Sequence, residues 1–478
     1  MITEISFVLD GKIVTIDFSK SESVTPTTTV LEYLRMLPNH KGVKEGCAEG
    51  DCGACTVVLG ELGESNFIGY KAVDSCLIFL PKLHRKQLVT VENLTDRSGG
   101  LHPVQSAMVD AGGSQCGFCT PGFVMSLFSL YKNADRPDRS QIDDALTGNL
   151  CRCTGYRPII EAASKACVGK GMDHFNSEEP EITKLLSSIP AGSLTIATER
   201  QKYFIPSTLK EALSLKGSYP NAALICGGTD VALRVTKKHE LIEEIIDISD
   251  VGELDRIVQS KEALSLGSGV PLTKAMPYLE KDFPALHGML KVFASRQIRN
   301  VATFGGNLGT ASPIGDTLPV LIAYGASVTL AHSGGTRELP LEKFFVGYRQ
   351  TARRPEELIV SISIPKMSTR LLVKSYKVSK RKDLDISTLS GGFRLDLNED
   401  STVKEIVLAY GGMAATTKRA AKAEHFLIGK KWTREEVERA MPLVDNDFTP
   451  ISDARSGAEF RKVAARNLLL KFWRETSL

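Results

Sequence analysis

The sequence lacks the features that are typical of nucleic-acid-binding, membrane and secreted proteins. Its 59 lysines and arginines nearly balance its 56 aspartates and glutamates. Because no basic run or aromatic-interleaved basic patch occurs, we expect neither a nucleic-acid nor a membrane partner. No apolar stretch is long enough to cross a bilayer, and the first residues lack the basic region and apolar core of a signal peptide. We therefore expect a soluble, cytoplasmic protein with reduced thiols.

Cysteine is scarce and unevenly distributed, with ten cysteines in 478 residues. The first group, Cys47, Cys52 and Cys55, has the C-x4-C-x2-C spacing by which plant-type ferredoxins hold a [2Fe-2S] cluster, and Cys76 supplies a distant fourth thiol. A second group combines two close pairs from separate segments, Cys116 with Cys119 and Cys151 with Cys153. Each group thus offers four thiolates, the soft anionic donors that a cluster of two irons requires.

Two other uses of these cysteines have to be weighed. Disulfides fit poorly, because the cysteine density is low and the reduced compartment that we expect disfavours them. Structural zinc suits the spacing of Cys116 and Cys119 taken alone, although Cys151 and Cys153 are closer together than in most zinc knuckles. The iron–sulfur interpretation is favoured for both groups, and zinc stays open for the second. Cys167 and Cys226 are interpreted as packing residues, and His102 as a capping or loop residue.

Periodicity predicts several domains of mixed α and β structure. Alternating residues around Asp10-Gly11 predict a hairpin, and Thr28 or Thr29 begins a helix, which together suit a β-grasp, ferredoxin-like domain over 1–90. Four helices are expected over 91–170, the third of them capped by Ser140. The range 171–195 has no periodicity and is predicted to be a linker.

The remaining sequence predicts an α+β region over 196–370 and a second over 371–478. Two glycine loops, 227–230 and 303–310, could let a pyrophosphate approach the backbone closely, although plain turns are equally consistent with them. Neither a Rossmann nor a P-loop motif is present. The final helix is expected from about Gly457 to Trp473. Its core-facing residues are predicted to be Phe460, Val463, Ala464, Asn467 and Leu468.

Taken together, these motifs closely resemble one known family. The first cysteine run, the stretch from Gln115 to Gly122 and the stretch from Cys151 to Tyr156 resemble the two iron–sulfur domains of the xanthine oxidase family of molybdenum hydroxylases. The glycine loops at 224–230 and 302–316 look like that family's FAD-binding loops. The resemblance implies a flavin domain of the vanillyl-alcohol-oxidase type followed by a C-terminal α+β domain.

The resemblance also implies which residues bind the cofactors. The cluster ligands would be Cys47, Cys52, Cys55, Cys76, Cys116, Cys119, Cys151 and Cys153. The residues at the FAD would be Leu224, Ile225, Cys226, Gly227, Gly228, Thr229, Asp230, Val231, Phe293, Thr303, Phe304, Gly305, Gly306, Asn307, Asp316, Ile359 and Lys377. No residue of this chain is expected to act as a catalytic acid, base or nucleophile in the hydroxylation.

The family further implies a molybdopterin-binding large subunit as partner, because no molybdenum domain follows in this sequence. Purine hydroxylation would take place on that partner, and this chain would pass the electrons through two [2Fe-2S] clusters and FAD to NAD, within a heterotetramer. Three alternatives stay open: the same role for an aldehyde or N-heterocycle hydroxylase, an iron–sulfur electron carrier or redox sensor, and a zinc-binding interaction module.

Overall fold

The protein is described by a computed structural model that covers residues 3–20, 23–63, 67–96, 98–169, 171–368 and 370–477. Residue 170, the expected end of the helical domain, lies outside these ranges. The chain forms two compact units: Met1–Thr208, Asn221–Asp250 and Ser295–Ala302 make the first, and Leu209–Pro220, Val251–Ala294 and Thr303–Leu478 the second. Throughout the described ranges, every helix is too short or too polar to cross a membrane.

The first unit opens with a five-stranded sheet of order β2-β1-β5-β3-β4. Its strands are β1 (Glu4–Leu9), β2 (Lys12–Asp17), β3 (Thr56–Leu62), β4 (Ile68–Asp74) and β5 (Gln87–Val89). The predicted hairpin turn is confirmed, since Asp10 and Gly11 both have positive φ, 53° and 69°, as a two-residue turn of this kind requires. Thr29 caps α1 (Val30–Met36) in a capping box with Glu32, also as predicted.

Four helices follow the sheet, as expected: α2 (Pro103–Asp110), α3 (Thr120–Asn133), α4 (Arg139–Leu146) and α5 (Arg157–Ala166). They share one apolar core with the outer face of the sheet, and Cys167 is buried in it as predicted. The predicted cap of α4 was wrong. Asp138 caps this helix, with Gln141 completing the capping box, and Ser140 already lies within the first turn. His102 is the N-cap of α2, as interpreted from the sequence.

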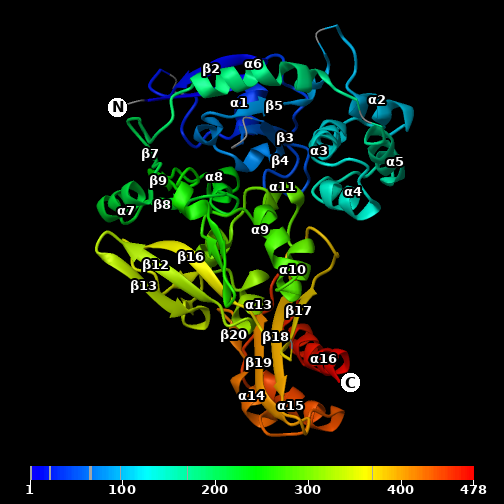
Figure 1. The fold of residues 1–478 in the computed structure, drawn as a ribbon, viewed down its shortest axis with the longest axis vertical. Helices are drawn as coiled ribbons and strands as arrows, with labels where there is room; N and C mark the ends of the chain where they lie inside the picture. Colours follow the sequence, from blue (N-terminus) through cyan, green and yellow to red (C-terminus); the bar gives the residue numbers. More distant parts are fainter. Residues whose placement is uncertain are drawn as a thin grey trace. The chain divides into compact units, whose positions relative to one another are not determined.

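The predicted linker contains a helix instead. Helix α6 (His174–Ser188) begins at Asp173, which forms a capping box with Asn176, and it lies along the first sheet (Figure 1). Phe175, Ile182 and Leu186 are buried in the core shared with the four helices. These three residues recur at near-helical spacing, but the surrounding glutamates, serines and proline obscured the pattern in the sequence.

Asp173 gives the first unit a predictable response to acid. Its side chain is 2% exposed and lies 3.1 Å from both His102 Nε2 and Lys132 Nζ. Burial opposes ionisation, but the hydrogen bond from His102 and the charge of Lys132 hold the pKa of Asp173 at about 2, below the ordinary 3.8. Between about pH 2 and pH 4, the unfolded chain therefore binds more protons at Asp173 than the folded chain does. The contribution of ionised Asp173 to stability is complete above about pH 4 and is lost as the pH falls to about 2.

We expect Asp173→Asn to lower the free energy of unfolding by about 1 to 2 kcal/mol near pH 6, with the difference from the unmodified protein shrinking below about pH 4. Urea titrations of both proteins at a series of pH values measure this difference. Asp110→Asn, at the end of α2, is a matched control expected to show no such trend. A difference independent of pH would contradict the assignment.

A small sheet of order β6-β7-β9-β8 completes the first unit. Its strands are β6 (Leu194–Ala197), β7 (Lys202–Ile205), β8 (Ala223–Ile225) and β9 (Glu244–Asp247), and two short helices accompany it, α8 (Ala232–Thr236) and α11 (Arg296–Arg299). Strands β7, β9 and β8 pair in parallel. Their apolar residues continue the core of the first sheet and α1, so the first glycine loop, which follows β8, is held against the ferredoxin-like part.

The second unit contains a five-stranded sheet of order β10-β11-β16-β12-β13. Its strands are β10 (Ile257–Gln259), β11 (Ala263–Gly267), β12 (Ser327–His332), β13 (Gly335–Pro340) and β16 (Leu358–Pro365), with a separate pair β14 (Phe345–Gly347) and β15 (Gln350–Thr351). The accompanying helices are α7 (Leu209–Ser218), α9 (Leu272–Leu279), α10 (Pro284–Lys291), α12 (Phe304–Thr310) and α13 (Thr317–Ala323). The second glycine loop thus includes α12, which packs on β16.

The last sheet of the second unit is antiparallel, in the order β17-β18-β19-β20. It comprises β17 (Leu372–Val378), β18 (Leu389–Leu397), β19 (Val403–Gly411) and β20 (Lys418–Arg419), followed by α14 (Ala421–Leu427), α15 (Arg434–Asp445) and α16 (Ala458–Thr476) (Figure 1). The predicted core face of α16 was largely wrong. Phe460 and Val463 are 54% and 44% exposed, while Ala465, Leu469 and Phe472 are buried beside Leu468.

Candidate cluster and flavin sites

The first cysteine group lies in a loop of the first unit between α1 and β3, with Cys76 arriving from the short turn after β4. The four sulfurs form two pairs. Cys55 Sγ lies 3.4 Å from Cys76 Sγ, and the thiols of Cys47 and Cys52 are hydrogen-bonded to each other. Cys55 and Cys76 are buried, whereas Cys47 and Cys52 are partly exposed. The loop therefore presents two sulfur pairs, one in the core and one nearer the surface.

Backbone amides surround the more exposed pair. The N–H groups of Glu49 and Asp51 donate to Cys47 Sγ over 3.4 and 3.2 Å. The hydrogen bond with Cys52, together with these amides, lowers the pKa of Cys47 to about 5. Gly50 has a φ of +77°, a conformation open mainly to glycine, and it lets the loop turn its amides toward the sulfur. The loop thus stabilises a thiolate, the form that binds iron.

The second cysteine group lies among the four helices. Cys119 is the N-cap of α3, and Cys151 and Cys153 lie in the turn before α5. The sulfurs are again paired, since hydrogen bonds join Cys116 to Cys153 and Cys119 to Cys151. Burial and the Cys151 contact raise the pKa of Cys119 to about 12. Cys116 and Cys153 are exposed, so one pair of this group faces solvent.

The pairing of the cysteine sulfurs indicates which metal group these residues fit. A mononuclear zinc site needs four donors at about 2.0 to 2.3 Å from one point. Over the described ranges, no three histidine, cysteine, aspartate or glutamate side chains converge in this way. A [2Fe-2S] cluster instead places two sulfur ligands on each of two irons, which is the two-plus-two arrangement found in both groups. The donor sets therefore fit two binuclear clusters better than zinc.

The first predicted flavin segment, 224–231, begins within β8 and is tightly packed within the first unit. A Cβ atom on Gly227 would lie 2.2 Å from the carbonyl oxygen of Val301, so only glycine fits there. Lys82, which the sequence analysis missed, donates a hydrogen bond over 2.5 Å to the carbonyl of Cys226 and pairs with buried Asp247 at 3.3 Å. Nothing in the local sequence of Lys82 signals this role, because its partners lie more than 140 residues away.

The other predicted flavin residues lie in the second unit, and hydrogen bonds connect several of them. Asn307 accepts from the hydroxyl of Thr317 over 2.6 Å, next to Asp316. Asp316 pairs with Lys377 at 3.0 Å, both side chains being at most 7% exposed. Lys377 also donates to the carbonyl of Val292 over 2.9 Å, which fixes the main chain just before Phe293. The structure thus brings together residues from four separate segments.

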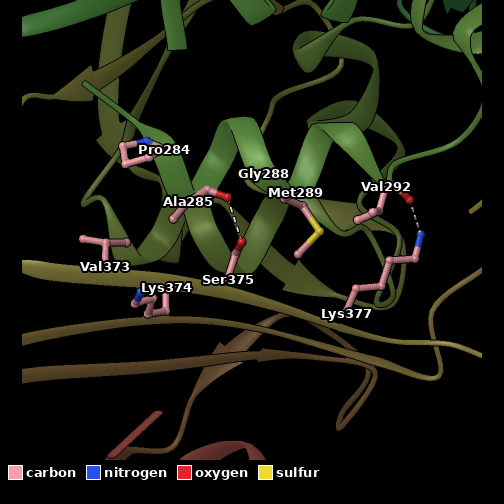
Figure 2. Close-up of a pocket in the computed structure, with 9 residues that line it drawn as sticks. All are labelled: Pro284, Ala285, Gly288, Met289, Val292, Val373, Lys374, Ser375 and Lys377. Carbon is pink, nitrogen blue, oxygen red and sulfur yellow. Dashed lines mark hydrogen bonds between the residues drawn. The ribbon is translucent and has the colours of Figure 1, made fainter. Parts of the chain in front are cut away.

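A cavity of about 370 Å³ begins at this cluster and runs between α10 and β17 (Figure 2). Its walls are mostly apolar, including Met289 on the helix and Val292 at its C-cap, with Lys374 and Lys377 on the strand. Ile359 lies on β16 instead and is 8% exposed. A Cβ on Gly309, at the end of α12, would be 3.6 Å from it. Ile359 therefore belongs with the second glycine loop rather than with the cavity.

Comparison with known sequence families matches four successive domains. Residues 14–79 match a 2Fe-2S iron–sulfur cluster binding domain and 90–164 a [2Fe-2S] binding domain. Residues 197–367 match the FAD binding domain in molybdopterin dehydrogenase, and 374–476 the CO dehydrogenase flavoprotein C-terminal domain. The predicted fold class and the predicted cofactors of this chain, two [2Fe-2S] clusters and FAD, are confirmed by these matches.

Curated relatives include xanthine dehydrogenase/oxidase of Gallus gallus, 33% identical across 98% of this chain and 40% of that protein. Xanthine dehydrogenase of Oryza sativa subsp. japonica is also 33% identical, across 93% of this chain and 38% of that protein. The chain therefore spans about 40% of the length of the curated relatives it matches.

Among solved structures, the chain is similar to a carbon monoxide dehydrogenase from Hydrogenophaga pseudoflava that lacks the Mo-pyranopterin moiety of the molybdenum cofactor. The identity is 26% and the TM-score 0.54, over 57% of this chain and 96% of that one.

The fold and the donor groups define an iron–sulfur flavoprotein with two [2Fe-2S]-binding domains and one FAD-binding domain. Within that class, the four domains in this order make up the iron–sulfur and FAD portion of a molybdenum hydroxylase of the xanthine oxidase family.

Proposed function

We propose that this chain is the small subunit of a bacterial-type xanthine dehydrogenase. Its partner would be a molybdopterin-binding large subunit that oxidises xanthine or hypoxanthine, with NAD as the final acceptor and a heterotetramer as the assembly. The observation that carries the proposal is the presence of two paired-thiolate groups and a flavin domain in one chain that is similar, over nearly its whole length, to xanthine dehydrogenases.

When bound, the clusters supply one-electron transfer, and FAD collects two electrons and passes them on as a hydride. The residues of this chain hold these groups and set their surroundings. We propose the eight paired cysteines as cluster ligands, with Cys55 and Cys76 shielded in the core and Cys116 and Cys153 at the surface. We further propose that the Asp316–Lys377 pair of the second unit positions the flavin. The hydroxylation itself uses no residue of this chain.

The direct test is the visible absorption spectrum with iron, flavin and molybdenum quantitation. The protein would be purified alone and after co-expression with its genomic neighbours. We expect about four irons and about one FAD per chain, with molybdenum only in the co-purified complex. Xanthine-dependent NAD reduction should appear only in that complex. Zinc in place of iron, or protein without flavin, would contradict the proposal for the domain concerned.

The surface around the second cysteine group supports a docking site for the electron-donating partner. Phe118, Leu150 and Tyr156 are 47%, 41% and 36% exposed, and they neighbour the exposed Cys116 and Cys153 in the sequence. Apolar side chains that remain in water next to a redox group are typical of a protein–protein interface.

We expect Phe118→Asp to weaken co-purification of the molybdopterin chain by at least about tenfold, because it places a charge in an apolar contact. Iron and flavin content should not change. Phe67→Asp is the matched control, because Phe67 is 57% exposed but lies beside the hairpin of β3 and β4. Equal retention of the partner by both variants would rule out this face. Pull-down and sedimentation measure the association.

The same domains could serve a hydroxylase with a different substrate, since the chain is also similar to a carbon monoxide dehydrogenase. Assaying the co-expressed complex with xanthine, aldehydes, N-heterocycles and carbon monoxide distinguishes these substrates. If the complex oxidises an aldehyde, an N-heterocycle or carbon monoxide but not xanthine, the proposed substrate is wrong. The proposed electron-transfer role of this chain would still stand.

A further inference from the structure

The loops that carry the two cysteine groups contact each other directly within the first unit. The amide of Leu150, one residue before Cys151, donates a hydrogen bond to the carbonyl of Cys52 over 3.0 Å. A Cβ on Gly122, in the first turn of α3, would lie 2.1 Å from the carbonyl oxygen of Gly53. The two groups are therefore joined by a backbone hydrogen bond and by backbone packing that leaves no room for a side chain at Gly122.

A single buried amide lies at the centre of this contact. Asn149 is 3% exposed, and its Nδ2 donates to the Gly53 carbonyl over 3.1 Å and to Thr56 Oγ1 over 3.2 Å. Its Oδ1 accepts from Ser126 Oγ at 2.6 Å and from Gln297 Nε2 at 2.9 Å. The side chain thus connects the first cysteine loop, β3, α3 and α11.

We infer that Asn149 is the positioning residue that sets the separation of the two clusters, by holding the Gly53 loop against the Leu150 amide. The inference rests on the proposed ligands, because it treats both loops as cluster-bearing. A carboxamide suits the position because it donates on one side and accepts on the other. An aspartate keeps the size and the acceptor but cannot donate, so it would turn an oxygen toward the Gly53 carbonyl.

The test uses the full chain with bound clusters and compares Asn149→Asp and Asn149→Ser with Asn300→Asp. Asn300 is a matched control, since it is 8% exposed and donates from Nδ2 to the Ala72 carbonyl over 2.8 Å, away from the contact between the two loops. Two quantities are measured: amide exchange of the segment containing Leu150, and the magnetic interaction between the two reduced clusters in electron paramagnetic resonance.

In both Asn149 variants we expect the Leu150 amide to exchange about tenfold faster, as loss of an ordinary hydrogen bond implies. The amides of α5 should exchange unchanged, and the magnetic interaction should weaken. Asn300→Asp should leave both quantities as in the unmodified protein.

Unchanged exchange at Leu150 in the Asn149 variants would overturn the inference, and so would faster exchange that extends equally through α5, because Asn149 would then only stabilise the domain. If Asn149→Asp loses iron, the inference is tested with the neutral Asn149→Ser variant alone. Unchanged exchange at Leu150, or faster exchange that extends equally through α5, overturns the inference in that variant as well. Absence of two [2Fe-2S] signals from the unmodified protein would instead refute the proposed function, so the two failures are distinguishable.

Discussion

Replacing Cys55 by alanine is expected to remove about half of the iron bound by the protein. Cys55 is 2% exposed and its sulfur is 3.4 Å from that of Cys76, so with the proposed ligands the substitution would remove one of the four thiolates that hold the first cluster. The second group shares no ligand with the first and should keep its cluster. Iron analysis together with electron paramagnetic resonance of the reduced protein measures the loss, with one of the two signals disappearing.

The control for this variant is Cys167→Ala. Cys167 is likewise buried, at 1% exposure, but it packs in the core of the helical domain and belongs to neither group. It should retain all of the iron, with only a modest loss of stability from the smaller side chain. Full iron content in Cys55→Ala, or the same loss in both variants, would contradict the ligand assignment. The Cys55 variant should also fail to pass electrons to an external acceptor.

Replacing Lys377 by methionine is expected to lower the free energy of unfolding of the second unit by about 3 kcal/mol and to abolish stable FAD binding. The Lys377 side chain is 6% exposed, and its ammonium group pairs with Asp316 at 3.0 Å. Its removal leaves a buried carboxylate without a counter-charge, and it also removes the hydrogen bond to the Val292 carbonyl. Urea unfolding and the flavin content of the purified protein measure the two effects.

Lys374→Met is the matched control, because Lys374 lies on the same strand and lines the same cavity (Figure 2) without an ion pair among the described residues. It should change stability by less than about 0.5 kcal/mol. Adding Asp316→Asn to the Lys377 variant should restore part of the stability, because the unpaired charge is removed. Flavin retention by the Lys377 variant at normal occupancy would contradict the placement of this lysine at the cofactor.

Sequence reasoning succeeded where a residue's role depends on its near neighbours. The turn at Asp10-Gly11 and the cap at Thr29 were predicted from a few adjacent residues, because turn and cap geometry is local. It failed where burial depends on distant segments. Phe460 and Val463 have the spacing of a core face, but the sheet beneath α16 contacts Leu469 and Phe472 instead.

The prediction of a linker over 171–195 was wrong for the same reason. Helix α6 contains few apolar residues, and Phe175, Ile182 and Leu186 become core residues only because the sheet and the helical domain offer them a surface. Without knowledge of that surface, a segment rich in glutamate, serine and proline is reasonably interpreted as a connection between domains.

By itself, the sequence determined the chemistry of this protein. Cluster formation demands thiolates at short intervals along a glycine-containing loop, so the spacing Cys47, Cys52, Cys55 is informative before any folding is known. Only the tertiary structure decided which sulfurs pair, that Lys377 is neutralised by Asp316, and that Asn149 joins the two cysteine loops. Those relations connect residues dozens to hundreds of positions apart, and their energies come from burial and from hydrogen-bond geometry, which exist only once the chain has packed.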